Sequence, residues 1–490
     1  MKKFPLILVV TICVNICTIA QSLPEPEREF RAVWIATVDN IDFPSDRTLT
    51  IDEQKAELLR DLDLASRLNL NAVIFQVRPM ADALYRSEIE PWSEYLTGEM
   101  GKPQAFDPLE FIVAEAHKRG ILVHAWFNPY RAYHPSAKTV SEDHISKRRP
   151  DLVRKYGKYL WMDPTDDEVQ KHSLKVILDV VKRYDIDGVH FDDYFYPYIE
   201  KDENGHDIEF PDDKNWNAYQ ASIVEANQRS AKNRKPLGRG DWRRMHVNNF
   251  ISSVGREVKR AKPHVMYGIS PFGIWKPMPE LGIEGLNAYE GLYADSLKWL
   301  QEGWVDYFAP QLYWETARRA QSFPVLLKWW NEQNIKSRHI WPGLASYRIG
   351  RNENWPVTEL TNQIKGIRAS KSTAGEIYFN FKSLRNNQGG VQNELLQNSY
   401  QHKAIIPASP WIKTKRPLDP KVTITRIGDL INAKWKPANN AFWYLVYAKD
   451  KTGWSYSVLP SSERSISLSN DIKIEKVIVK SVDRLGNISN

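Results

Sequence analysis

The chain has 490 residues, more than one hydrophobic core usually holds, so we expect a large domain and a smaller one. Its formal net charge is only +7 and its Lys and Arg residues are spread along the sequence, which argues against a nucleic-acid-binding protein. Both of its cysteines, Cys13 and Cys17, fall in the N-terminal leader, which excludes a disulfide framework in the mature protein.

Residues 1–20 have the pattern of a secretory signal peptide. Lys2 and Lys3 precede an apolar run that extends to Cys17, and small residues follow as far as Ala20. The run is too short for a membrane span, so we expect an exported protein of the periplasm or cell envelope with no integral span after cleavage. Loss of the two lysines changes the net charge from +7 to +5. A lipid on Cys17 is the alternative, although Val14-Asn15-Ile16 is a poor lipoprotein pattern.

Residues 28–405 alternate between short apolar strands and amphipathic helices. We predict eight strands: Ala32–Thr37, Ala72–Val77, Leu122–Phe127, Gly188–Asp192, Met266–Ser270, Tyr307–Gln311, Ile340–Ala345 and Glu376–Phe381. The helices predicted between and after them are Asp52–Leu68, Pro108–Arg119, Glu168–Tyr184, Trp242–Ala261, Tyr293–Glu302, Phe323–Gln333, Val357–Ser370 and Val391–His402. Eight such units predict an α/β fold, a (β/α)8 TIM barrel. An open doubly wound sheet is the alternative, but the first strand is not followed by its Gly-rich phosphate turn.

The fourth predicted strand ends at two adjacent carboxylates, Asp192 and Asp193. Side chains alternate along a strand, so Asp192 should project with His190, and Asp193 with Phe191. Because active sites of this barrel form at the carboxyl ends of the strands, one carboxylate is expected to point into a cleft. The alternative is that both merely cap the loop that follows.

Long loops follow the second to fifth predicted strands: Pro79–Asp107, Asn128–Asp167, Tyr194–Asp241 and Pro271–Leu292. They contain many of the aromatic side chains of a sequence with 18 Trp and 22 Tyr. Flat aromatic rings at a cleft stack on sugar faces, although most tryptophans in any protein fill its core. The loops therefore favour a walled groove for an extended polymer.

Residues 417–490 have a different pattern. Short alternating strands are predicted at Val422–Ile427, Leu430–Trp435, Trp443–Lys449, Ser455–Leu459, Ile466–Leu468 and Lys476–Val482. They predict a small C-terminal β-sandwich that resembles a fibronectin type III domain. Such a module usually acts as a spacer or docks to the envelope or to another protein.

Six segments in order resemble the secreted glycosyl-hydrolase-like family ten. They are FRAVWIAT (30–37), NAVIFQVRP (71–79), HAWFNPYR (124–131), DGVHFDDYFYP (187–197), GISPFGIW (268–275) and APQLYW (309–314). The likeness extends from about Glu29 to His402. It implies a TIM-barrel glycosidase, with family members that cleave peptidoglycan glycan strands lacking stem peptides in the bacterial envelope.

Glycoside hydrolysis usually needs two carboxyl groups, one that stabilises or attacks the anomeric centre and one that protonates the leaving oxygen. Asp192 is the candidate for the first, since its setting is similar to the fourth-strand motif of amylase-like barrels. A chitinase-type acid is excluded, because Tyr194 stands where its Glu belongs. Glu315 is the candidate for the second, with Asp193 as the rival; the alternative for Glu315 is a charge at a helix N-terminus.

Polar and aromatic residues near the ends of the predicted strands are the candidates for substrate binding. They are Asp39, Gln76, Arg78, Trp126, Asn128, Tyr130, Arg131, His190, Trp275, Gln311, Tyr313, Trp314 and Asn380. An arginine among them can bind a lactyl carboxylate. For Arg78 the alternative is an ion pair with Asp192, and for His190 it is a hydrogen-bonded place in the core.

The sequence has no zinc, calcium-loop or nucleotide motif, so we expect neither a metal nor a cofactor. The expected partner is a polysaccharide or glycan strand, not a nucleic acid. A carbohydrate-binding barrel without activity and a glycosidase for dietary or host polysaccharide are the competing hypotheses.

Overall fold

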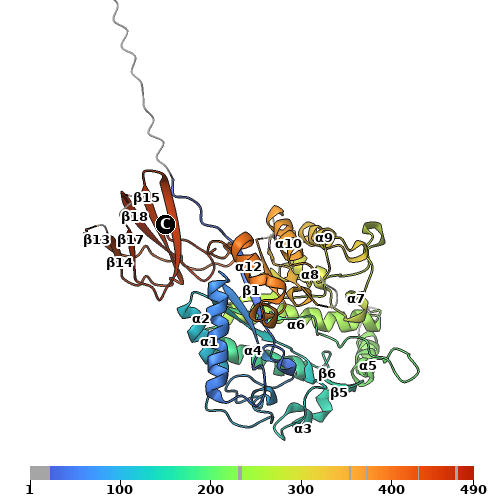
Figure 1. Cartoon of the computed structure of the whole chain (residues 1–490). Coiled ribbons are helices and arrows are strands. Elements are labelled where there is room, and N and C mark those ends of the chain that lie inside the picture. The colour runs from blue at the N-terminus through green and yellow to red at the C-terminus, as the bar shows by residue number, and fades with distance from the viewer. Residues whose placement is uncertain (1–21, 230–233, 352–354, 371–373, 429, 470–472) are drawn as a thin grey trace, which may run out of the picture.

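A computed structural model of the chain describes residues 22–229, 234–351, 355–370, 374–428, 430–469 and 473–490. The predicted signal peptide and both cysteines lie outside these residues. Within them, a helix-covered barrel is followed by a smaller β-module (Figure 1). No helix of the described residues is both long and apolar enough to cross a membrane.

The central sheet is parallel throughout. Its strands are β1 (Phe30–Ile35), β2 (Ala72–Arg78), β3 (Leu122–Phe127), β7 (Gly188–Phe191), β8 (Met266–Ile269), β9 (Tyr307–Phe308), β10 (His339–Ile340), β11 (Gly343–Leu344) and β12 (Gly375–Tyr378). Their order is β10-β9-β8-β7-β3-β2-β1-β12-β11. Only Trp341 and Pro342 separate β10 from β11, so both are halves of the predicted seventh strand. Because β10 pairs with β9 and β11 with β12, this segment joins the two edges and the predicted eight-stranded barrel is confirmed.

Helices cover the outside of the barrel at all eight predicted places. They are α1 (Ile51–Arg67), α2 (Pro108–Lys118), α4 (Asp167–Arg183), α6 (Arg239–Ala261), α8 (Ser296–Glu302), α9 (Phe323–Gln333), α10 (Thr358–Ala369) and α12 (Val391–Glu394). After α12 the chain continues as a π-helical turn to Ser399, so the predicted last helix was too long. Outward-facing strand residues such as Val189 and Phe191 pack beneath these helices in the main hydrophobic cluster.

The loops contain elements that the sequence patterns did not predict. After β3 come β4 (Arg131–Tyr133), α3 (Ile145–Arg148), β5 (Val153–Tyr156) and β6 (Tyr159–Met162), of which the strands form an antiparallel sheet. α5 (Asp213–Arg229), α7 (Ala288–Gly291) and α11 (Phe381–Arg385) lie in other loops. No residue of α5 is fully buried, so this helix lacks the strong apolar stripe by which a helix is recognised in a sequence.

Large aromatic side chains fill the lumen of the barrel. Phe30 of β1 stacks on Trp341 with ring centroids 3.8 Å apart, and the Tyr307 ring lies nearby at 4.9 Å from Trp341. Gly268 of β8 makes room for Tyr307, because a Cβ atom there would lie 1.9 Å from the ring carbon Cζ. The lumen is therefore a packed core with no spare volume at this level.

The C-terminal module consists of β13 (Val422–Ile427), β14 (Leu430–Trp435), β15 (Trp443–Asp450), β16 (Gly453–Pro460), β17 (Ser465–Ser469) and β18 (Lys476–Val482). Its two antiparallel sheets have the orders β13-β14-β17 and β16-β15-β18. Ile431, Trp435, Tyr444, Val446 and Val479 are among the side chains packed together from the two sheets. The predicted β-sandwich is confirmed, whereas its likeness to fibronectin type III stays a prediction.

This module packs against the amino-terminal ends of the barrel strands. Trp443 donates from Nε1 to the carbonyl of Gly120, just before β3, at 2.8 Å. Arg484 pairs with Asp185, before β7, at 2.6 Å. Figure 1 shows the module at one end of the molecule and the β5–β6 insertion at the other. The carboxyl ends of the strands are thus left free of the module.

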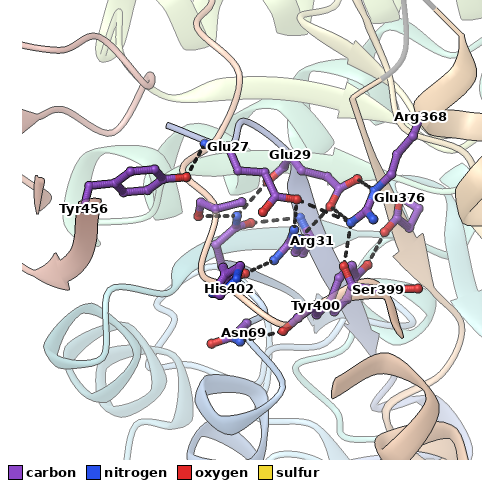
Figure 2. Close-up of polar contacts among 12 residues, drawn as sticks. Glu27, Glu29, Arg31, Asn69, Arg368, Glu376, Ser399, Tyr400, His402 and Tyr456 are labelled. Atoms are coloured by element: carbon purple, nitrogen blue, oxygen red, sulfur yellow. Dashed lines mark hydrogen bonds and ion pairs between the residues drawn. The ribbon is translucent and has the colours of Figure 1, made fainter. Parts of the chain in front are cut away.

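A polar network ties the two ends of the barrel segment together at this same face (Figure 2). Buried Arg31 of β1 donates from Nε to Glu29 at 2.7 Å, and Arg368 of α10 donates from Nη2 to the same carboxylate at 2.7 Å. Tyr400, beyond α12, donates its hydroxyl to Glu376 of β12. Burial, with the negative charge of Glu29, raises the pKa of Glu376 to about 8. Glu376 is thus a buried acid that is protonated at neutral pH.

The close contact of Gly268 with Tyr307 predicts that Gly268→Ala destabilises the chain by about 1 to 3 kcal/mol or more, because the added methyl overfills the lumen. The matched control is Gly366→Ala at an exposed position of α10, where, apart from the neighbouring residues and backbone of the helix itself, no described heavy atom lies within 4 Å of the new methyl. This change should stabilise by about 0.5 to 1 kcal/mol. Denaturant unfolding of both variants measures the two effects, and equal behaviour would contradict the lumen packing.

The raised pKa of Glu376 predicts a pH-dependent stability. Its value in the fold, about 8, exceeds the ordinary 4.5, so the folded state binds a proton more tightly than the unfolded state. The free energy of unfolding should therefore fall as the pH rises from 4.5 to 8, by at most about 1.4 kcal/mol per pH unit from this group. Glu376→Gln should remove that slope in urea unfolding between pH 6 and 9, while Glu203→Gln in an exposed loop should keep it. A slope that survives Glu376→Gln would show that the proton is bound elsewhere.

Candidate active site

A cavity of about 290 Å³ opens at the carboxyl ends of the barrel strands. Its aromatic and apolar walls are Trp34, Ala36, Val38, Ile41, Trp126, Tyr194, Tyr198, Tyr313 and Phe379. Its polar residues are Gln76, Arg131, His134, Asp192, Asp193, Ser270 and Gln311. A hollow with mostly aromatic walls and a few convergent polar groups is typical of a small-molecule or sugar site.

Asp192 lies at the floor of this cavity and is 6% exposed. Its Oδ2 accepts hydrogen bonds from Trp126 Nε1 at 3.1 Å and from Asn128 Nδ2 at 2.6 Å, and its Oδ1 accepts from the backbone N–H of Tyr194 at 3.2 Å. Burial raises the pKa of Asp192, while the charge of Arg131 and these donors lower it. The carboxylate is therefore held in one orientation by three donors.

Asn128 is itself fixed by residues of neighbouring strands. Its Oδ1 accepts from Gln76 Nε2 at 2.7 Å and from Arg131 Nη2 at 2.8 Å. The other end of the Gln76 amide accepts from the backbone N–H of Thr37 at 2.8 Å. A chain of amide hydrogen bonds thus crosses the carboxyl ends of β1, β2 and β3 and ends at the carboxylate of Asp192.

Asp193 lies beside Asp192 and is 2% exposed. Its Oδ2 accepts a hydrogen bond from the hydroxyl of Tyr198. Burial and the negative charge of Asp192 raise the pKa of Asp193 to about 7, against the lowering effect of hydrogen bonds from Tyr198 and Gln311. At neutral pH a large fraction of Asp193 is therefore protonated and able to donate a proton.

The histidines around the cavity are neutral. Burial and the charge of Arg131 lower the pKa of His134 to about 4. His190 lies below Asp192, where burial lowers its pKa well below 6.5; its Nε2 accepts from Trp34 Nε1 at 3.1 Å. Its Nδ1 therefore carries the proton and donates to the hydroxyl of Tyr307 at 2.9 Å, and that hydroxyl donates to Nδ1 of His124 at 2.9 Å. His190 thus has the hydrogen-bonded core position that was the alternative to its role in substrate binding.

Seven of the residues predicted for the site line the cavity: Asp192, Asp193, Gln76, Trp126, Arg131, Gln311 and Tyr313. Asn128 and His190 lie directly behind them, bonded to Asp192 and Trp34. The other predicted residues are not among the lining residues of the cavity.

Those other residues have different surroundings. Arg78 is buried in an ion pair with Glu90 at 2.5 Å and donates to the carbonyl of Asn128 at 2.6 Å, so an ion pair of Arg78 with Asp192 is not present. Tyr130 is fully buried against Phe250, and Asn380 is buried at the start of α11. Further out lie half-buried Trp275, which stacks on Trp329, half-buried Trp314 and Glu315, and exposed Asp39.

Several lining residues were not singled out from the sequence. Tyr194 and Tyr198 follow Asp193 in the same aromatic run, and the Arg131 guanidinium lies 5.2 Å from the ring centre of Tyr194. Phe379 stacks on Tyr313 with centroids 6.0 Å apart. The density of tyrosines after the acidic pair was the available signal, whereas nothing in the pattern marked Phe379.

The described residues contain no group of three or more His, Cys, Asp or Glu side chains placed to hold a metal ion. Hydrogen-bond donors and acceptors, two carboxyl groups and aromatic rings are what the cavity offers a ligand.

A family model described as Glycosyl hydrolase-like 10 matches residues 29–357. The chain belongs to this family. Two curated relatives are the glycosyl hydrolase YngK of Bacillus subtilis strain 168 and the glycosyl hydrolase DigH of Escherichia coli strain K12. YngK is 39% identical over 442 residues, which cover 86% of this chain and 83% of YngK. DigH is 33% identical over 385 residues, which cover 72% of this chain and 83% of DigH.

Among solved structures, the catalytic domain of β-amylase from Paenibacillus polymyxa superposes with a TM-score of 0.53 at 11% identity, over 77% of this chain and 99% of that domain. At that identity the likeness concerns the barrel fold alone. Membership of the glycosyl hydrolase-like 10 family makes the chain a glycoside hydrolase, and its cavity with two carboxyl groups is the candidate active site.

The hydrogen bond from Tyr198 to Asp193 predicts a shift in the pH profile. Tyr198→Phe removes a donor that favours the charged form, so the pKa of Asp193 should rise above about 7. Such a bond is worth about 1.5 kcal/mol, or about one pH unit. The limb of the kcat/KM profile that reports Asp193 should move to higher pH by that amount.

Tyr133→Phe is the matched control, because the Tyr133 hydroxyl donates to the carbonyl of Ala137, away from the cavity. Its pH profile should overlay that of the unaltered chain. An unshifted or downward-shifted profile for Tyr198→Phe would contradict the contact.

Proposed function

We propose that this glycoside hydrolase is exported and cleaves the glycan strands of a peptidoglycan-type cell wall, with Asp192 and Asp193 as its catalytic carboxyl groups. The observation that carries the chemical part is the adjacent acid pair in an aromatic-walled cavity at the carboxyl ends of the barrel strands. The choice of a peptidoglycan-type glycan rests on the resemblance of the six sequence segments to the glycosyl-hydrolase-like family ten. The signal-like residues 1–20 support export.

The two carboxyl groups suit different parts of the reaction. Asp192 is surrounded by donors and by the positive charge of Arg131, which suits a carboxylate that stabilises positive charge at the sugar. Asp193, whose pKa burial and Asp192 raise to about 7, suits the group that protonates the leaving oxygen. Asp193 therefore takes the acid role for which Glu315 was the first sequence candidate.

The walls of the cavity suit a sugar chain. Trp34, Trp126, Tyr313 and Phe379 offer flat apolar faces for pyranose rings. The volume of about 290 Å³ is close to the smaller ligand pockets, so it holds the sugars at the broken bond and leaves the rest of a strand outside. Arg131 at the same wall offers a cation for the lactyl carboxylate of a muramic acid unit.

Purified sacculi stripped of stem peptides test this function. The unaltered chain should release new reducing ends, and Asp193→Asn should lower the rate by about 10²- to 10⁴-fold, the usual range for a lost general acid. Glu315→Gln should lower it by less than about tenfold, because Glu315 does not line the cavity.

A larger loss with Glu315→Gln than with Asp193→Asn would overturn the assignment of the acid. Thermal unfolding of both variants serves as the folding control. Cleavage of a panel of plant and host polysaccharides, with no cleavage of sacculi, would overturn the proposed substrate and favour a dietary or host glycan.

A further inference from the structure

Both carboxyl groups of the cavity come from one point of the barrel. Asp192 and Asp193 are consecutive, so their Cα atoms are about 3.8 Å apart. In the usual glycosidase mechanisms two carboxyl groups flank the scissile bond from opposite sides. Among the described residues that line the cavity there is no third carboxyl; the other polar lining residues are Gln76, Arg131, His134, Ser270 and Gln311. Both acids of the cavity thus come from the end of one strand, β7, and no described lining residue from another strand is a carboxylate.

Asp192 is a hydrogen-bond acceptor that is already held by the protein. Three donors, Trp126 Nε1, Asn128 Nδ2 and the N–H of Tyr194, fix its two oxygens. A carboxylate offers about four acceptor positions, so room remains for one further N–H or O–H from a ligand. The indole of Trp126, which contacts this carboxylate, also forms part of the cavity wall and provides an apolar surface beside it. This corner of the cavity therefore fits a ligand group in which an N–H stands next to a small apolar substituent.

We propose that the attacking group is the 2-acetamido group of the substrate, and that the enzyme is therefore selective for a 2-acetamido sugar at the anomeric side of the broken bond. In this arrangement Asp192 accepts the acetamido N–H and directs its carbonyl oxygen to the anomeric carbon, while the methyl packs on Trp126. Asp193 is the proton donor to the leaving oxygen. This inference rests on the proposed function and deepens it.

The reaction has two balanced steps. In the first, the acetamido oxygen forms a bond to the anomeric carbon, the bond to the glycosidic oxygen breaks, and Asp193 gives its proton to that oxygen; Asp192 stabilises the positive charge on the resulting oxazoline ring. In the second, water attacks the anomeric carbon, Asp193 takes a proton from the water, and the ring opens to restore the acetamido group. One water is consumed, the configuration is retained, and no bond to the protein forms.

Glycan strands with altered acetamido groups test the proposal. Peptide-free strands are compared with the same strands after chemical N-deacetylation and after subsequent re-acetylation. Native and re-acetylated strands should be cleaved, and the deacetylated strands at least about 100-fold more slowly, because a free amine cannot attack through a carbonyl oxygen. Equal rates on native and deacetylated strands would overturn the inference and leave the proposed function intact. If none of the three is cleaved, the proposed function is wrong and the inference falls with it.

A second experiment examines the intermediate in the unaltered chain. The thiazoline analogue of N-acetylglucosamine, a stable mimic of the oxazoline, should inhibit the enzyme, and Asp192→Asn should weaken its binding at least about tenfold in calorimetry. Intact-protein mass spectrometry after incubation with an activated 2-deoxy-2-fluoro glycoside should show no added mass. A sugar bound to Asp192, or an inverted product by NMR, would overturn the proposal even if Asp192→Asn does not fold.

Discussion

The buried carboxylate of Asp192 is the constraint on which the site depends. A charged group that is 6% exposed must find its hydrogen-bond donors inside the protein. The parallel register of β3 and β7 supplies them: Phe127 lies opposite Phe191, so the next residues along, Asn128 and Asp192, are neighbours. The side-chain oxygen of Asn128 in turn accepts hydrogen bonds from Gln76 and Arg131. The orientation of the acid is thus set largely by residues at the ends of the barrel strands, with one donor, the N–H of Tyr194, from the loop that follows β7.

The same dependence connects the site to the barrel core. Trp34 and Trp126 belong to the hydrophobic cluster of the lumen and also line the cavity. Below them, neutral His190 uses both of its ring nitrogens in hydrogen bonds, one to Trp34 and one to Tyr307. The floor of the cavity is therefore the uppermost layer of a packed interior. Changes in the lumen are transmitted to the acid pair through side chains that have little freedom to move.

Strand periodicity predicted the barrel well, because each buried strand is a short apolar run between turn signals. It also predicted that His190 and Asp192 share a face, and the structure has Val189 and Phe191 under the helices and His190 in the lumen. The alternation of side chains applies only within the strand, and β7 ends at Phe191. Asp193 therefore reaches the same cavity as Asp192, although alternation would place them on opposite faces.

Contacts with loops could not be predicted by counting along strands. Arg78 ends β2 where a substrate-binding cation was expected, but Glu90, twelve residues further along a loop, pairs with it. Glu315 follows a strand of only two residues, β9, so the direction of its side chain was not fixed by periodicity. The helix α5 was not predicted although it is regular. It buries no residue fully, so its sequence has no strong apolar stripe.

The position of the β-module has a consequence for how the cavity is presented to a substrate. Trp443, Trp411 and Arg484 join the module to the barrel at the starts of the strands, and residues 27–29 enter at this same pole. Any attachment made through either terminal region would consequently hold the molecule by its base, with the mouth of the cavity directed outward. A polymeric glycan could then reach the cavity from the side opposite to such an attachment.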